Sequence, residues 1–111
     1  MNNIKIFRAN RGEGKTKWLF DRAVEEHDNG KHLYYVGIEK SMETLARMWE
    51  ATFHEKCPIT RWDESSDIIR PCCILTDEMF DNLYDIALWF NFMKQYDASW
   101  YITVGKEYFV N

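Results

Sequence analysis

The sequence lacks any apolar run approaching the roughly twenty residues that a membrane-spanning helix needs. Its first residues, Met1-Asn2-Asn3, also lack the basic and apolar regions of a secretory signal peptide. No linker, internal repeat or low-complexity segment interrupts the 111 residues, so we expect a single domain over 1–111. These absences predict a cytoplasmic protein with no membrane segment.

Cysteine is scarce, and its spacing does not match the usual metal and redox motifs. The three cysteines are Cys57, Cys72 and Cys73, and no C-x-x-C motif is present. Neighbouring cysteines rarely form a disulfide with each other, and a zinc site needs suitably spaced partners. We therefore expect no zinc site, and reduced thiols with Cys72 or Cys73 in the core.

An excess of basic residues is also missing, because the formal net charge is −4. That balance argues against a broad basic face for duplex DNA, although it leaves room for a local basic groove. Apolar residues make up 46% of the chain, including five Trp, six Tyr and seven Phe. A globular chain of this size can bury roughly two-thirds of its unfolded surface. Aromatic residues left outside that core can serve an interface.

The most informative stretch runs from Ile4 to Leu19. It begins with an apolar alternation that predicts a buried strand, passes through a glycine-bearing turn to Gly14-Lys15-Thr16, and ends in a helical pattern. Strand, loop and helix in that order are the context that a phosphate-binding P-loop requires. In such a loop, backbone N–H groups and the positive end of the helix dipole point at one spot.

The residues of this loop suit the binding of a nucleoside triphosphate. The segment Gly12-Glu13-Gly14 lets the backbone approach the phosphates closely. Lys15 reaches the β- and γ-phosphates, and the Thr16 hydroxyl completes the coordination shell of Mg²⁺. The common pattern G-x-x-x-x-G-K-[ST] is incomplete, because its first glycine falls at Ala9. The alternative is a loop that merely contains a lysine and two glycines.

Downstream of this stretch, the sequence patterns predict alternating strands and helices. We expect helices at 14–28, 41–53 (capped by Ser41) and 80–96, a turn at 63–66, and strands at 32–37, 59–62, 72–76, 100–104 and 108–110. This order predicts a three-layer α/β fold, with a mostly parallel sheet of about four to five strands flanked by helices. Ligands of such sheets sit beyond the carboxyl ends of the strands, where the P-loop, Asp77-Glu78 and Gly105 fall.

The acidic pair Asp77-Glu78 follows a continuous apolar run that suits a strand buried on both faces. An acid at the end of such a strand can hold the water shell of Mg²⁺, and we assign this role to Asp77. The next acid, Glu78, can polarise the attacking water. The alternative is a helix cap, in which Asp77 or Thr76 begins the helix that follows.

With these two motifs the chain resembles the P-loop NTPases of the additional-strand, catalytic-glutamate type, which include RecA-like motors, helicases and phage terminases. Its segment Arg11-Gly12-Glu13-Gly14-Lys15-Thr16 is similar to the R-x-x-G-K-[ST] form found in terminase large-subunit motors. The resemblance implies ATP and Mg²⁺ as cofactors. It also implies that Arg11 acts in cis on the γ-phosphate, which suits a planar guanidinium; the alternative is a solvated loop arginine. Thr103 is the nearest match to a γ-phosphate sensor in the following strand, or it is an ordinary strand threonine.

Two functions are compatible with this sequence. The first is a small Mg²⁺-dependent ATPase that acts in or regulates a nucleic-acid machine, with a protein partner or as a homo-oligomer. The second is a non-catalytic interaction module that keeps the P-loop fold and docks a partner through its aromatic residues. A nucleotide kinase is less well supported, because the segment after Asp77-Glu78 carries no lid arginine.

Compared with the motors of that group, the chain is a miniature core. It has no room for a nuclease domain, a lid or a translocating arm, and it has no upstream glutamine to read adenine. Its compact size suits a phage or mobile-element protein.

Overall fold

The computed structural model describes residues 3–63 and 67–111. Its elements in chain order are β1 (Asn3–Ala9), α1 (Lys15–Asp28), β2 (His32–Tyr35), α2 (Glu39–Phe53), β3 (Thr60–Arg61), β4 (Cys72–Asp77), α3 (Leu83–Met93), the 3₁₀ turn η1 (Lys94–Tyr96) and β5 (Ser99–Gly105). The first two residues and most of the turn expected at 63–66 lie outside the described residues.

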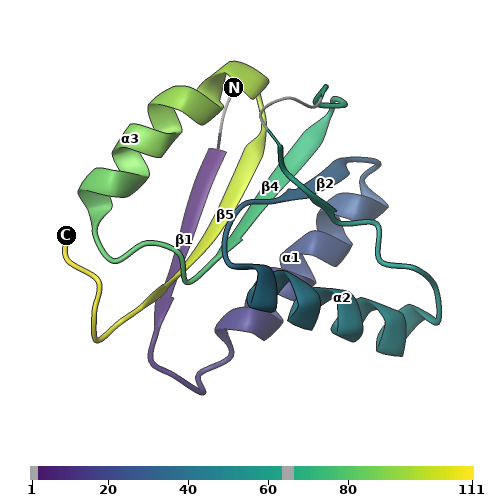
Figure 1. Cartoon of the computed structure of the whole chain (residues 1–111), viewed down its shortest axis with the longest axis horizontal. Coiled ribbons are helices and arrows are strands. Elements are labelled where there is room, and N and C mark those ends of the chain that lie inside the picture. The colour runs from purple at the N-terminus through teal and green to yellow at the C-terminus, as the bar shows by residue number, and fades with distance from the viewer. Residues whose placement is uncertain (1–2, 64–66) are drawn as a thin grey trace.

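The strands form one sheet in the order β1-β5-β4-β2-β3, and every neighbouring pair is parallel. The last strand in sequence, β5, therefore lies between β1 and β4 (Figure 1). It pairs with β1 from Asn3 opposite Ser99 to Ala9 opposite Gly105. The expected α/β fold with a mostly parallel sheet is confirmed, and the sheet has five strands.

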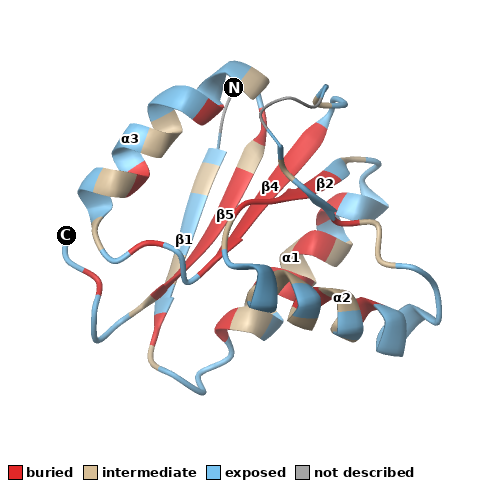
Figure 2. Cartoon of the chain, viewed as in Figure 1, coloured by how far each residue is buried: buried red, intermediate tan, exposed pale blue. Residues whose placement is uncertain are grey.

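Helices cover both faces of this sheet (Figure 1). On one face α1 and α2 pack against a layer that contains Cys73 and Leu75 of β4. On the other face α3 packs against a layer that contains Cys72 and Ile74. The alternation arises because successive side chains of a strand point to opposite faces. Every position of β4 is buried, as its continuous apolar run predicts (Figure 2).

Two predictions about helix starts are wrong. The helix α2 follows Ile38 and begins at Glu39, so Ser41 lies inside the helix and does not cap it. The helix α3 begins at Leu83, three residues later than the sequence pattern predicts. The side chain of Asn82 caps α3 by accepting a hydrogen bond from the backbone N–H of the third helical residue.

This position of α3 also settles the alternative role of the acidic pair. Thr76 and Asp77 are the last residues of β4 and do not cap the helix that follows.

The strand expected at 108–110 does not form. Beyond β5 the chain makes turns, and only Val110 forms a bridge, with Asn82. Two backbone hydrogen bonds fix it there, because Val110 donates to the Asp81 carbonyl at 2.8 Å and accepts from the Leu83 N–H at 2.8 Å. The end of the chain therefore lies across the start of α3 (Figure 1).

The carboxyl ends of β1, β4 and β5 meet at one edge of the sheet (Figure 1). Ala9 at the end of β1 is opposite Gly105, and Asp77 at the end of β4 is opposite Thr103. The loop at 10–14, the acidic pair and Gly105 are thus gathered at this edge, as the order of elements predicts.

The described residues also bear on the membrane and cysteine predictions. None of the helices within 3–63 and 67–111 is long and apolar enough to cross a membrane. Cys57, Cys72 and Cys73 are free thiols, and both Cys72 and Cys73 are buried in the core.

Candidate functional site

The loop between β1 and α1 leaves the N-terminus of α1 open to an anion. Gly12 and Gly14 have positive φ angles of 81° and 83°, a backbone region that strains residues with a side chain. Gly14 is the N-cap residue and provides no side-chain acceptor, and the first helical hydrogen bond runs from the Trp18 N–H to its carbonyl at 2.9 Å. The backbone N–H groups of the first turn, at 15–17, therefore have no acceptor within the helix.

Lys15 lies at the start of this helix and is buried, with 6% of its surface exposed. Its Nζ donates a hydrogen bond to the Ala9 carbonyl at 3.2 Å and lies 3.4 Å from Oε1 of Glu78. The ammonium group is therefore held at the carboxyl edge of the sheet, between the end of β1 and the residue that follows β4.

Asp77 is almost completely buried and is bonded by two threonine hydroxyls. Thr16 Oγ1 of α1 donates to Oδ2 at 3.1 Å, and Thr103 Oγ1 of β5 donates to Oδ1. Burial raises the pKa of the Asp77 carboxyl, because desolvation disfavours its charged form, while the two hydroxyls act in the opposite direction.

Glu78 has its backbone in the left-handed region, with φ of 51°. Its N–H donates to the Thr103 carbonyl at 3.1 Å and to the Thr103 hydroxyl at 3.0 Å. Its side chain is about half exposed and reaches Lys15. The structure therefore joins Thr103 to both acids, a role that its place in an apolar strand did not reveal.

Two adjoining hollows surround Lys15. The smaller, of about 330 Å³, is lined by Arg11, Gly12, Gly14, Lys15, Thr16, Lys17 and Glu78. The larger, of about 570 Å³, is lined by Asn10, Arg11, Lys15, Glu78, Gly105, Lys106, Glu107 and Tyr108. Arg11, Lys15 and Glu78 therefore border both spaces.

Glu13 plays a different part in this conformation. Its N–H donates to the Asn10 carbonyl at 3.1 Å, and its carboxylate accepts a hydrogen bond from the Asn10 N–H. It shapes the turn that presents Gly12 and Gly14.

The site offers few protein ligands to a metal ion. Within the described residues, no group of three or more His, Cys, Asp or Glu side chains is placed to hold one. Thr16 and Asp77 are adjacent oxygen donors of the type that Mg²⁺ prefers. Mg²⁺ usually retains waters and binds together with substrate phosphates, so this pair fits it only alongside a phosphate ligand.

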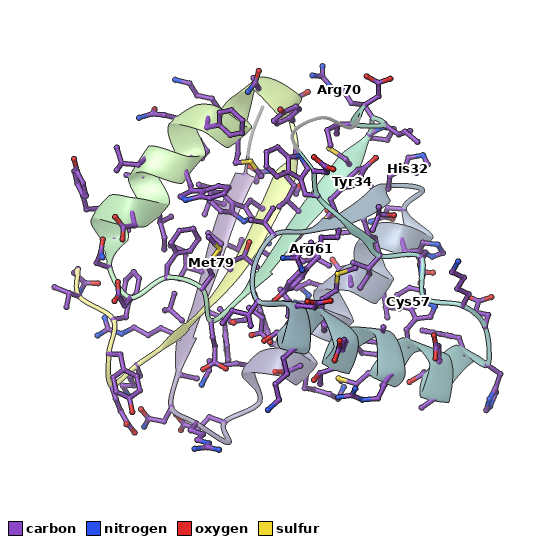
Figure 3. All side chains as sticks on the ribbon, viewed as in Figure 1. His32, Tyr34, Cys57, Arg61, Arg70 and Met79 are labelled. Atoms are coloured by element: carbon purple, nitrogen blue, oxygen red, sulfur yellow. The ribbon has the colours of Figure 1, made fainter. Side chains whose placement is uncertain are left out.

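Three further arginines, Arg47, Arg61 and Arg70, line neither hollow. Arg70 precedes β4 and donates to the Gln95 carbonyl at 3.1 Å, at the end of the sheet away from the site (Figure 3). Arg61 donates to the Gly37 carbonyl at 3.3 Å from edge strand β3 (Figure 3). Arg47 is exposed on α2 and donates to Thr44 of the same helix.

The sequence patterns gave no indication of the wall formed by Lys106, Glu107 and Tyr108. These residues follow Gly105, which was expected to end a strand and, with Lys106, to turn the chain back into a strand at 108–110. A basic residue directly after a strand end, here Lys106, is the local signal from which a further cation at this edge could have been predicted.

Comparison with known proteins identifies no relative. No protein-family model matches the chain, and no curated protein or solved structure matches it.

We predict that Asp77→Asn stabilises the protein in the absence of Mg²⁺ and nucleotide. The raised pKa means that the folded state binds a proton more readily than the unfolded state, so the charged carboxylate lowers stability as pH rises through its pKa. The melting temperature of the variant should exceed that of wild type near about pH 7, and the difference should shrink on acidification. Thermal melting across this pH range tests the prediction.

Asp67→Asn is the matched control, because Asp67 is exposed and lies outside the site. A melting temperature of Asp77→Asn below that of wild type at neutral pH would contradict the prediction.

Proposed function

We propose that this protein is a small P-loop ATP-binding protein that binds Mg·ATP and hydrolyses it slowly. The observation that carries the proposal is a single arrangement at the carboxyl edge of the sheet. The open N-terminus of α1 bears Lys15 and Thr16, and Thr16 is hydrogen-bonded to Asp77 at the end of a buried parallel strand.

The phosphate chain is the part of the ligand that this arrangement supports best. Unpaired N–H groups and the helix dipole favour an anion at the start of α1. Lys15 adds a full positive charge, and its neighbour Glu78 is the group that a terminal phosphate would replace as its partner. Thr16 and Asp77 would hold Mg²⁺ against the same phosphate, where the ion neutralises developing charge.

The position of β5 supports the assignment to the additional-strand type. This strand separates β1, which leads into the loop, from β4, which carries the acids. Glu78 suits the role of water-activating residue, because its side chain borders both hollows and its backbone is fixed by Thr103.

Action in a nucleic-acid machine is proposed from the resemblance to the terminase loop, and a phage origin from the compact size of the chain. A cytoplasmic location is supported by the three free thiols, which persist in a reducing compartment.

A second candidate function, the protein-interaction module, is favoured by the outer surface of α3. Tyr84, Leu88 and Phe92 are 72%, 50% and 41% exposed. Large exposed apolar residues grouped on one helix are typical of protein interfaces. Docking of a partner on this helix is compatible with nucleotide binding, since the residues of α3 line neither hollow at the phosphate site.

We predict that Lys15→Ala weakens the binding of Mg·ATP by about ten- to hundredfold, the scale of a charge-assisted hydrogen bond. Calorimetry with ATP, GTP and a non-hydrolysable analogue, with and without Mg²⁺, measures this and the base preference. Lys56→Ala, an exposed lysine outside the site, should bind like wild type. If wild type binds no nucleotide at millimolar concentration in the presence of Mg²⁺, the proposal is wrong.

We predict that Glu78→Gln retains nucleotide binding and loses turnover by a factor of ~10² to 10⁴, the usual contribution of general-base catalysis. Release of inorganic phosphate under single-turnover conditions measures the loss. Equal rates in wild type and the variant would show that Glu78 is not the general base and would favour the interaction module.

We predict that Arg11 supplies the transition-state cation in cis, because it borders both hollows. Such a cation contributes ~10³ to 10⁵ in rate. Arg11→Ala should abolish hydrolysis, and wild-type specific activity should stay constant on dilution. Dilution-sensitive activity that survives in Arg11→Ala would assign the cation to a neighbouring subunit instead.

A further inference from the structure

We propose that Lys106 binds the terminal phosphate of the nucleotide, on a turn that the end of the chain forms beside the P-loop. This inference rests on the proposed function and names a third cation, after Lys15 and Arg11, for the same site. It assigns a binding role to residues 105–108, which carry no recognisable motif.

The two hollows indicate which phosphate faces this turn. The smaller hollow is lined by the open helix N-terminus, so under the proposed function it would receive the phosphate chain. Lys15 and Glu78 lie where it adjoins the larger hollow, so the terminal phosphate comes to that boundary. Groups on the far wall of the larger hollow therefore face the terminal phosphate and not the first one.

Backbone hydrogen bonds fix that wall against the P-loop strand. The Lys106 N–H donates to the Ala9 carbonyl at 2.9 Å, the same carbonyl that accepts from Lys15 Nζ at 3.2 Å. Within the turn, the N–H groups of Tyr108 and Phe109 donate to the Gly105 carbonyl at 3.2 Å and 2.9 Å. The two lysines are thus anchored to one backbone atom.

Arg8 ties the rest of this segment to β1. Its guanidinium donates to the carbonyls of Lys106 at 3.4 Å and Phe109 at 3.1 Å, and to the Asn111 side chain at 3.3 Å. It also lies 5.6 Å from the centroid of the Phe109 ring. Since Val110 is bonded in turn to the start of α3, the segment is held at both ends. A turn supported in this way can keep its side chains in place for a ligand.

The Lys106 side chain itself is exposed. No hydrogen bond or ion pair with another described residue involves its ammonium group. The larger hollow carries three cations, Arg11, Lys15 and Lys106, against the two acids Glu78 and Glu107. That surplus of positive charge suits a phosphate. Glu107, the acid next to Lys106, should weaken phosphate binding through its negative charge.

The test compares the affinities of a non-hydrolysable ATP analogue and of ADP, both with Mg²⁺, by calorimetry. Lys106→Ala should weaken binding of the ATP analogue by about tenfold or more. It should change the affinity for ADP by less than about twofold, because only the terminal phosphate of the triphosphate reaches this wall. Glu107→Gln should increase the affinity for the ATP analogue and leave that for ADP unchanged. Lys106→Arg, which keeps the positive charge, should retain most of the wild-type preference for the ATP analogue over ADP. Lys56→Ala serves as the matched control.

Other outcomes separate the two proposals. An unchanged triphosphate affinity in Lys106→Ala, or an equal loss for both nucleotides, overturns the role of Lys106. If Lys15→Ala still loses binding in that case, the proposed function stands without it. A wild-type protein that binds neither nucleotide overturns both proposals.

Arg8→Ala tests the support of the turn in a separate way. If Arg8 positions Lys106, its removal should lower the ratio of triphosphate to ADP affinity, which general destabilisation would not change selectively. A variant that melts at a lower temperature but keeps the wild-type ratio would show that Arg8 has only a structural role.

Discussion

The buried carboxylate of Asp77 is the constraint on which the geometry of this edge depends. A charge without hydrogen-bond partners is costly to bury, and here hydroxyls from two different elements, Thr16 of α1 and Thr103 of β5, are bonded to it. Thr103 also accepts a hydrogen bond from the N–H of Glu78. This bond helps to hold Glu78 in a left-handed backbone conformation, which is unfavourable for a residue with a side chain. Asp77 thus links the first turn of α1 to the end of β5. Through Thr103 it also helps to orient Glu78.

Much of this fold follows from local patterns. The glycines at 12 and 14 predict a loop that only a permissive backbone can form, and both indeed have positive φ angles. The apolar run of β4 predicts a strand covered on both faces, because a parallel sheet between helices has no solvated side. The carboxyl ends of parallel strands lie at the same edge of a sheet. This rule predicted that Lys15 and Thr16 would lie close to the acidic pair.

The remaining features depend on contacts between distant residues. Tyr108-Phe109-Val110 has the composition of a strand, but Arg8 and the start of α3 bind its backbone groups, so no neighbouring strand can pair with them. Asn82 caps α3 at the point where the chain bridges to Val110, a contact between residues far apart in the sequence. Thr103 resembles any buried strand threonine until its register opposite Asp77 is known. The place of Lys106 also depends on a distant contact, since its N–H donates to the carbonyl of Ala9, near the other end of the sequence.

The central place of the last strand has a consequence for how the molecule acquires its structure. Among the described residues, β1 and β4 have no pairing with each other, and each pairs with β5. The sheet can therefore be completed only after the final strand has been synthesised and inserted between two earlier ones. Contacts between such distant segments slow folding. Until that insertion β1 would lack the strand with which it pairs, and Asp77 would lack its hydrogen bond from Thr103.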